Sequence, residues 1–269
     1  MFEPSITLPA HLTETSGRWF LFDERRQLLL VDGVPPVGDQ ELPGVIDRHV
    51  LGSDASGPAF AGMIGPDFDF PPDGHFADLR QAFAVLPETE WMLAGRAAQV
   101  LNWDRDHQFC SRCGTATETH GSERARICPS CGLMAFPRLT PAVIMLVERD
   151  DGKALLAWGR QFPGRFFSAL AGFVEPGETL EQTVEREVME EAGVRVDDVR
   201  YFGSQPWPFP HSLMIGFNAT YAGGDLQIQE SEIVEAGWFD HNQLPPVPKG
   251  RMSIAGWLIE DWVKRMHGG

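Results

Sequence analysis

Acidic residues recur at helical spacing between Gly172 and Val194, where the chain reads GFVEPGETLEQTVEREVMEEAGV. Glu187, Glu190 and Glu191 stand at i, i+3 and i+4, so a helix places their carboxylates in one stripe. Like charges in such a stripe destabilise a helix unless cations neutralise them, and Mg²⁺ or Mn²⁺ prefers oxygen ligands. The segment therefore predicts a catalytic divalent-metal site, with Glu191 as the first candidate for ligand and base and Glu187 beside it.

Two residues near this stripe, Arg186 and Glu178, are expected to support it. Arg186 precedes Glu190 by four residues and can offset part of the negative charge. Glu178 lies nine residues before Glu187, half a turn out of phase, so we expect it at the helix entry, where it orients Arg186 and does not bind metal. Gly172 allows a ligand or metal to approach the backbone closely.

A second metal site is predicted by the cysteines. Four cysteines form two C-x2-C pairs separated by fourteen residues: Cys110, Cys113, Cys128 and Cys131. Two such pairs supply a closed tetrahedral S4 shell for a structural zinc ion. Two disulfides are the alternative, which would suit an exported protein.

The segment around the cysteines is locally basic. Four arginines stand there against Glu118 and Glu123: Arg112, Arg124, Arg126 and Arg138. Binding of nucleic acid is one interpretation of this ribbon, and a scaffold or dimer contact is the simpler one.

The overall charge limits the partners. With 38 Asp and Glu against 22 Lys and Arg, the net charge of −16 disfavours extended duplex binding. A short nucleotide ligand stays possible, because cations held by clustered carboxylates invert the local sign. No apolar run of membrane-spanning length and no export signal is evident, so we expect a cytoplasmic protein that does not bind membranes.

Hydrophobic periodicity divides the chain into three parts: a β-rich domain at 1–103 that ends in a helix over 88–103, a zinc ribbon at 104–137 and a domain at 138–269. In the last part we expect strands at 141–148, 154–158, 199–201 and 213–221, and helices at 179–192 and 252–266. This mixed order favours an α/β (α+β) sandwich. We interpret the first hundred residues as a docking or dimerisation module.

The acidic segment also carries a family resemblance. It matches G-x5-E-x7-R-E-U-x-E-E-x-G-U, with U aliphatic, without departure, and so resembles the signature of the Nudix hydrolases. The resemblance implies a C-terminal Nudix α/β/α sandwich and cleavage of a nucleoside diphosphate linked to another group by attack of water on phosphorus. It also makes the Ala171 carbonyl a further metal ligand.

A proline-rich segment follows, Ser204-Gln-Pro-Trp-Pro-Phe-Pro-His-Ser212. Its prolines restrict the backbone and hold Trp207 and Phe209 at fixed angles, which suits stacking on a flat base. Gln205 and Ser212 can hydrogen-bond an amide, ribose or phosphate. A proline-rich turn with core aromatics is the alternative.

SQPWPFPxS beyond a Nudix box and after a four-Cys ribbon resembles the NADH pyrophosphatase (NudC-type) family, over about Cys110 to the C-terminus. The resemblance implies hydrolysis of NADH and NAD⁺ to (reduced) nicotinamide mononucleotide and AMP, removal of 5′ NAD caps from RNA, and a homodimer. A Nudix enzyme that prefers ADP-ribose or another dinucleotide is the nearest rival. An RNA-binding zinc-ribbon protein is the rival of another class.

The family's residues carry over as follows. Its Mg²⁺ or Mn²⁺ ligands match Glu187, Glu191 and Glu232; strand alternation puts Glu230 on the same face as Glu232, so only the resemblance separates the two. Phe136 stands where some relatives have tyrosine, so ring contact survives without the hydroxyl. The substrate-binding positions implied are Phe136, Phe173, Gln205, Pro206, Trp207, Pro208, Phe209, Pro210, His211, Ser212 and Ala255.

Overall fold

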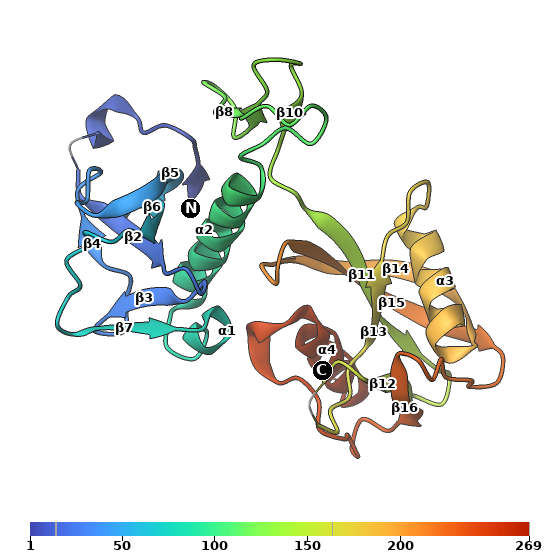
Figure 1. Ribbon diagram of the computed structural model, residues 1–269. Helices are drawn as coiled ribbons and strands as arrows, with labels where there is room; N and C mark the ends of the chain where they lie inside the picture. The colour runs from blue at the N-terminus through green and yellow to red at the C-terminus, as the bar shows by residue number, and fades with distance from the viewer. Residues whose placement is uncertain (14, 163, 269) are drawn as a thin grey trace. The chain divides into compact units, whose positions relative to one another are not determined.

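The computed structural model describes residues 1–13, 15–162 and 164–268 and divides into two compact units, Met1–Arg138 and Leu139–Gly269 (Figure 1). Each unit contains its own mixed sheet. The finer division of the first unit at residue 103 stays a prediction.

The second unit is built on a six-stranded sheet in the order β14-β15-β11-β12-β16, with β13 also paired to β11. The central pair β11 and β15 is parallel, and the other pairs are antiparallel. The strands are β11 (Thr140–Glu148), β12 (Ala154–Gly159), β13 (Leu170–Phe173), β14 (Arg195–Trp207), β15 (Ser212–Gly223) and β16 (Ile233–Phe239). The strand predicted near 199–201 is thus part of a much longer one.

Alternation along β11 builds two separate cores. Val143 and Val147 face a core with α3 (Leu180–Ala192), whereas Ile144 and Leu146 face a core with α4 (Ile254–Met266). Figure 1 shows the two helices on opposite sides of this sheet. The predicted α/β/α sandwich is confirmed.

The ends of α3 are set by its own sequence. Thr179 and Gln182 form a reciprocal capping box, in which Thr179 N donates to Gln182 Oε1 over 2.8 Å. Gly193 ends the helix at a φ of 71°, in the left-handed region that glycine tolerates. Between these ends Val184 and Val188 are fully buried, so packing fixes which face carries the acidic stripe.

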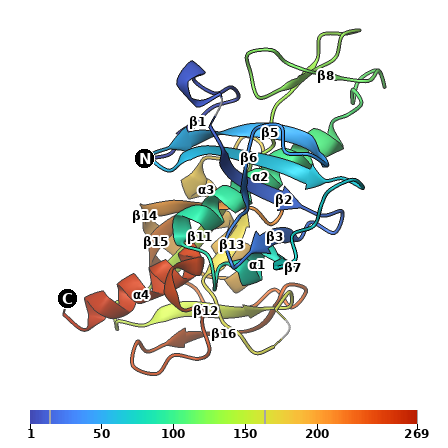
Figure 2. The same cartoon turned by 90° about the vertical axis from the view of Figure 1, so that its left-hand side faces the viewer.

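The first unit contains a seven-stranded sheet in the order β1-β5-β6-β2-β3-β7, with β4 paired to β2, and a three-stranded ribbon, β10-β9-β8. In the turned view of Figure 2, the long strands β5 and β6 run side by side. The elements are β1 (Glu3–Pro4), β2 (Gly17–Phe22), β3 (Leu28–Val31), β4 (Val37–Gly38), β5 (Val45–Asp54), β6 (Gly57–Ile64), β7 (Gly74–Ala77), α1 (Leu79–Ala82), α2 (Glu88–Asp106), β8 (Glu118–Thr119), β9 (Arg126–Ile127) and β10 (Met134–Ala135), with short 3-10 turns at Ala10–Leu12 and, in the second unit, Gly250–Met252.

The two sheets share one topology. The order β5-β6-β2-β3-β7 repeats β14-β15-β11-β12-β16 with the same strand directions, including a parallel central pair, and β4 pairs β2 as β13 pairs β11. The counterpart of α3 is missing, because only residues 39–44 connect β4 to β5. The face with Trp19 and Leu21 is covered instead by loop side chains such as Leu8, Leu42 and Phe68.

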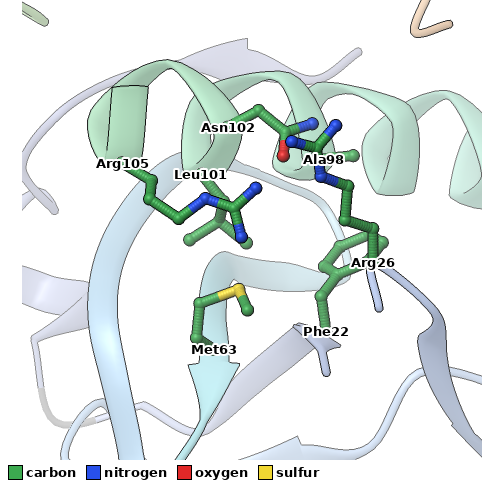
Figure 3. Close-up of a pocket in the computed structure, with 7 residues that line it drawn as sticks. All are labelled: Phe22, Arg26, Met63, Ala98, Leu101, Asn102 and Arg105. Carbon is green, nitrogen blue, oxygen red and sulfur yellow. The ribbon is translucent and has the colours of Figure 1, made fainter. Parts of the chain in front are cut away.

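The two copies also differ where the central strand ends. Glu148, the last residue of β11, accepts hydrogen bonds of 3.0 and 2.6 Å from both Nη atoms of Arg265 on α4. The same ladder position in β2 holds Phe22. There the chain leaves a small pocket, lined also by Met63 and Leu101 and bordered by Arg105 of α2 (Figure 3). The position that forms an ion pair in the second unit therefore lines a small pocket in the first unit.

Among the described residues, the helices are all too short or too polar to cross a membrane.

We expect Trp262→Ala to destabilise the second unit strongly. The Trp262 side chain is fully buried in the core between the sheet and α4, so its removal leaves a large cavity that costs about 3–5 kcal/mol. Denaturant unfolding measures the change. The matched control Lys264→Ala, on the exposed side of the same helix, should stay within about 0.5 kcal/mol; equal losses in both variants would contradict this packing.

Candidate active site

Arg186 is the hub of the acidic cluster on α3. Its Nε and Nη2 donate to the two carboxylate oxygens of Glu178 over 2.6 and 3.0 Å, and Nη2 also donates to the Phe173 carbonyl over 2.9 Å. Its Nη1 donates to Glu187 over 2.8 Å and to Glu190 over 3.1 Å. The hydrogen bonds from Arg186 hold the pKa of Glu178 at about 2. Glu178 therefore orients Arg186, as its position at the helix entry predicted.

Glu191 has the most perturbed environment in the cluster. Its side chain is buried, and its Oε2 has no hydrogen-bond partner among the described residues. Burial, followed by the negative charges of Glu187 and Glu232, raises the pKa of Glu191 to about 8, although a backbone N–H of Ala171 opposes the rise. Burial likewise raises the pKa of Glu187. Arg186 balances part of the charge on Glu187, whereas Glu191 has no ion pair among the described residues.

Gly172 creates the space for Glu187. A Cβ atom at this position would overlap the Glu187 carboxylate, so only glycine lets the side chain lie against β13. Neighbouring Ala171 is exposed and lies on the same strand, next to Glu191. Gly172 was predicted to let a ligand or metal approach the backbone closely. In the structure, the group that lies against it is the carboxylate of Glu187.

The structure corrects one argument about the third carboxylate. Glu230 and Glu232 lie in a turn before β16 and not in a strand, so alternation does not put them on one face. Electrostatics separates the two instead, because Glu232 raises the pKa of both Glu187 and Glu191. The preceding loop is held at the end of α3, where Gln229 N donates to the Glu191 carbonyl over 3.1 Å.

These residues fit a divalent cation. A buried carboxylate oxygen without a partner, beside two further carboxylates, is what a hard cation requires. The residues that would hold it are Glu187, Glu191 and Glu232, with the Ala171 carbonyl nearby. Within the described ranges these oxygens are not gathered as tightly as the four cysteine sulfurs, which all lie within 4.8 Å of one another.

The proline-rich segment forms the end of a hairpin. Gln205, Pro206 and Trp207 belong to β14, and residues 208–211 form the turn into β15. The rings of Trp207 and Phe209 meet edge to face with centroids 5.1 Å apart, and both are half-buried. The aromatic pair therefore has a fixed geometry, as the prolines predicted, and keeps some exposed surface.

The side chain of Gln205 forms hydrogen bonds within the protein. Its side chain is buried, its Nε2 donates to the Met252 carbonyl over 3.0 Å, and its Oε1 accepts from Ile254 N over 2.8 Å. The amide therefore positions the start of α4. Ser212 is also buried, so both side chains are largely shielded from solvent, and their contact with a ligand stays a prediction.

The remaining substrate candidates differ in exposure. Phe173 and Phe136 are 57% and 54% exposed, which leaves both rings available for stacking. Ala255 is buried in the first turn of α4. The Nδ1 atom of His211 lies 3.0 Å from Thr140 Oγ1, which ties the hairpin turn to the start of β11. Pro208 is buried and Pro210 is exposed.

The four cysteines come together as predicted. All are free thiols, and their closest sulfurs lie 3.5 to 3.7 Å apart, so the disulfide alternative is wrong. Gly114 and Gly132 adopt φ values of 74° and 72°, and their N–H groups close two equivalent turns on Cys110 and Cys128. This donor set fits a structural zinc ion with no open position.

Two of the four ribbon arginines serve the fold. Arg126 is buried and donates to Asp104 of α2 over 2.7 Å. Arg124 donates to the carbonyls of Ser5 and Val50 over 2.6 and 2.9 Å. The basic surface inferred from the composition is therefore smaller than expected, which weakens the interpretation of the ribbon as a nucleic-acid-binding module in its own right.

Comparisons with known proteins cover all three parts of the chain. Family models match as "NUDIX domain" at residues 138–259, "NADH pyrophosphatase zinc ribbon domain" at 105–136 and "NADH pyrophosphatase-like rudimentary NUDIX domain" at 16–103. A Stutzerimonas stutzeri protein named NAD-capped RNA hydrolase NudC is 41% identical over 94% of this chain and 92% of its own length. The chain belongs to the NADH pyrophosphatase family of Nudix hydrolases.

Other relatives agree with this family. A Deinococcus radiodurans protein of the same name is 51% identical over 66% of this chain, a match that spans 65% of that relative's length. A Nudix hydrolase from Nitrosomonas europaea has a similar structure, with a TM-score of 0.51 and 25% identity over 60% of this chain and 93% of that one. The enzyme is thus a Nudix hydrolase with a zinc ribbon.

The rudimentary Nudix domain is the feature that the sequence did not reveal. Residues 1–103 were expected to be a β-rich docking module, yet their sheet repeats the Nudix strand order without the acidic helix. A signal could have been found in the apolar runs at 19–22 and 28–31, which form a strand pair like β11 and β12.

We expect the stability of the enzyme, with zinc retained but without Mg²⁺ or Mn²⁺, to fall as the pH rises from about 5 to 8. The folded pKa of Glu191 is about 8, above the unfolded value of about 4.3, so the folded state binds the extra proton in this window. The slope from this group is at most about 1.4 kcal/mol per pH unit. Thermal unfolding at several pH values measures it.

The matched variant for this pH dependence is Glu191→Gln, which has no proton to lose at that position. Its slope between pH 5 and 8 should be smaller than that of the parent enzyme. An unchanged slope would show that Glu191 is not the group responsible.

We expect the purified enzyme to contain zinc and Cys128→Ser to lose it. The Cys128 thiol is fully buried in the cluster, and the ribbon it organises carries the Arg126–Asp104 ion pair. Elemental analysis measures the zinc, and thermal unfolding should show a lower Tm for the variant. Ser111→Ala, at an exposed position between two ligands, should keep both; equal zinc content in all three proteins would overturn the assignment.

Proposed function

We propose that this enzyme hydrolyses the diphosphate of NADH and NAD⁺, giving (reduced) nicotinamide mononucleotide and AMP, and removes 5′ NAD caps from RNA. The observation that supports it most is the buried carboxylate of Glu191, whose Oε2 has no partner among the described residues, beside Glu187 and Glu232. The relatives named NAD-capped RNA hydrolase supply the substrate class.

We assign the divalent site to Mg²⁺ or Mn²⁺, held by Glu187, Glu191 and Glu232 with the Ala171 carbonyl. A bound cation there would supply an acidified water and positive charge next to the phosphate oxygens. Glu191 is the first candidate base, because a bound cation would lower its raised pKa and keep the carboxylate deprotonated. Glu187 is the second candidate base.

The other residues of the cluster position these carboxylates. Glu178 holds Arg186 through both oxygens, and Arg186 in turn fixes Glu187 and the Phe173 carbonyl. Glu190 is more exposed and shares the same guanidinium, so we assign it a supporting electrostatic role.

The aromatic residues supply the base-binding surface. We propose that Trp207 and Phe209 receive one base and that the exposed ring of Phe173 receives part of the substrate. Phe136 keeps an exposed ring for the same purpose. The substrate-binding segment would comprise Gln205, Pro206, Trp207, Pro208, Phe209, Pro210, His211, Ser212 and Ala255, with Gln205 acting through α4.

Three further properties complete the proposal. We infer a reducing, cytoplasmic location, because four thiols without disulfides suit such a compartment. We propose a homodimer, which rests on the family resemblance. We also propose that the ribbon at 104–137 separates the domain at 1–103 from the Nudix domain at 138–269.

The direct test is chromatography of the products formed from NADH with and without Mg²⁺ or Mn²⁺. AMP and reduced nicotinamide mononucleotide should form only with the metal. Glu187→Gln should lower kcat at least about a hundredfold, because it removes a cation ligand and a candidate base. Glu185→Gln, an exposed glutamate on the same helix, should keep kcat within about twofold; if Glu187→Gln kept it as well, the site would lie elsewhere.

Trp207→Ala tests the substrate. We expect its kcat/KM for NADH to fall at least about tenfold, since stacking on one base contributes about 1–3 kcal/mol. ADP-ribose, which lacks nicotinamide, and NAD-capped RNA serve as comparison substrates. Equal loss on NADH and ADP-ribose would favour an enzyme selective for the shared ADP part.

A further inference from the structure

One face of α2 holds buried hydrogen-bond donors that no described residue satisfies. Arg96 Nε, Gln99 Nε2 and Trp103 Nε1 are buried without a partner. Their spacing of three and four residues places them on a single stripe of the helix. Three neighbouring donors without an acceptor require an electron-rich group, because an unpaired buried donor costs about 1–3 kcal/mol.

A second cation lies next to this stripe. Arg124 of the ribbon is close enough to Arg96 for their charges to repel, and burial together with this repulsion lowers the pKa of Arg124 to about 10. Neither guanidinium has a carboxylate within 4.0 Å in the described parts of the chain, although acidic residues outnumber basic ones in the molecule. Two partly desolvated like charges side by side are unfavourable without a counter-anion.

The surroundings hold both guanidinium groups in place. Arg124 Nη2 donates to the carbonyls of Ser5 and Val50, at the ends of the pairing between β1 and β5. The guanidinium of Arg96 lies over the ring of Phe2, 5.9 Å from its centroid. Arg96 and Gln99 are thus fixed on α2, and Arg124, in a bend of the ribbon, is fixed by its two carbonyl partners, as a preformed binding site requires.

We propose that Arg96, Gln99 and Arg124 form an anion site for a phosphate group, in the first unit and distinct from the acidic cluster on α3. Guanidinium groups bind phosphate through paired hydrogen bonds, and its tetrahedral oxygens can accept from donors in several directions. A free phosphate and a backbone phosphate of RNA share this chemistry. The site does not depend on the hydrolytic function proposed above, since none of its residues belongs to that machinery.

Inorganic phosphate is the first probe, added to the zinc-loaded, full-length enzyme at constant ionic strength. Phosphate at tenfold its dissociation constant should raise the Tm by about 2–4 °C. Arg96→Met should abolish the rise, and Gln99→Leu, a milder change, should reduce it. Arg25→Met, at an exposed turn, should keep it. Absence of a rise in the parent enzyme, or an equal rise in all four proteins, would overturn the proposal.

An RNA oligomer with a 5′-hydroxyl end identifies the source of the phosphate. If the site takes a backbone phosphate, Arg96→Met should weaken RNA binding about tenfold and lower the salt dependence by about one ion. If it takes free phosphate, only the phosphate titration should change. Sedimentation measures the oligomeric state of the parent enzyme and of Arg96→Met. If the variant changes its oligomeric state and phosphate does not raise the Tm of the parent, the donors bind a second copy of the chain, which would contradict the proposal. Hydrolysis of NADH, measured in parallel, should be unaffected.

Discussion

Mutual repulsion among carboxylates is the constraint around which the Nudix unit is organised. Burial raises the pKa values of Glu187 and Glu191, and the charge of Glu232 raises both further, as the charge of Glu187 does for Glu191. A helix with ordinary ends would relieve this strain by fraying. Here a capping box, a left-handed glycine and the buried valines of α3 hold the stripe in place, and Arg186 offsets part of the charge. The remaining negative charge favours the binding of a cation.

Local signals in the sequence were sufficient for the two helices and the central strands of the Nudix unit and for the acidic stripe, but not for β13, β16 or the length of β14. Periodicity placed α3 and α4 within two residues, and the two C-x2-C pairs predicted the thiol cluster, because these patterns depend on residues near one another in the chain. The hydrogen bonds of Gln205 to Met252 and Ile254 could not be predicted, because these partners lie more than forty residues away in the chain. Glu232 was chosen by the family resemblance alone, and the argument that strand alternation puts Glu230 on the same face is wrong because both residues lie in a turn.

The first unit illustrates how one sheet topology can be kept while its chemistry is absent. The segment between β4 and β5 is too short for a helix, so nothing places acidic residues at the strand equivalent to β13. Loop side chains close the exposed face around Trp19. The sheet keeps its fold because its own cores and α2 are sufficient to bury it. Its relationship to the Nudix sheet is therefore not visible in the amino-acid composition. Arg124 and Arg126 then hold the ribbon against β5 and α2, respectively.

The contact between Gly172 and Glu187 also limits how such an enzyme can change over generations. Any larger residue at position 172 displaces the Glu187 carboxylate, and a shorter side chain at position 187 removes the need for glycine at 172. The strand and the helix are therefore expected to accept mutations as a coordinated pair. A chimera that takes α3 from one Nudix protein and β13 from another should inherit both positions from the same parent.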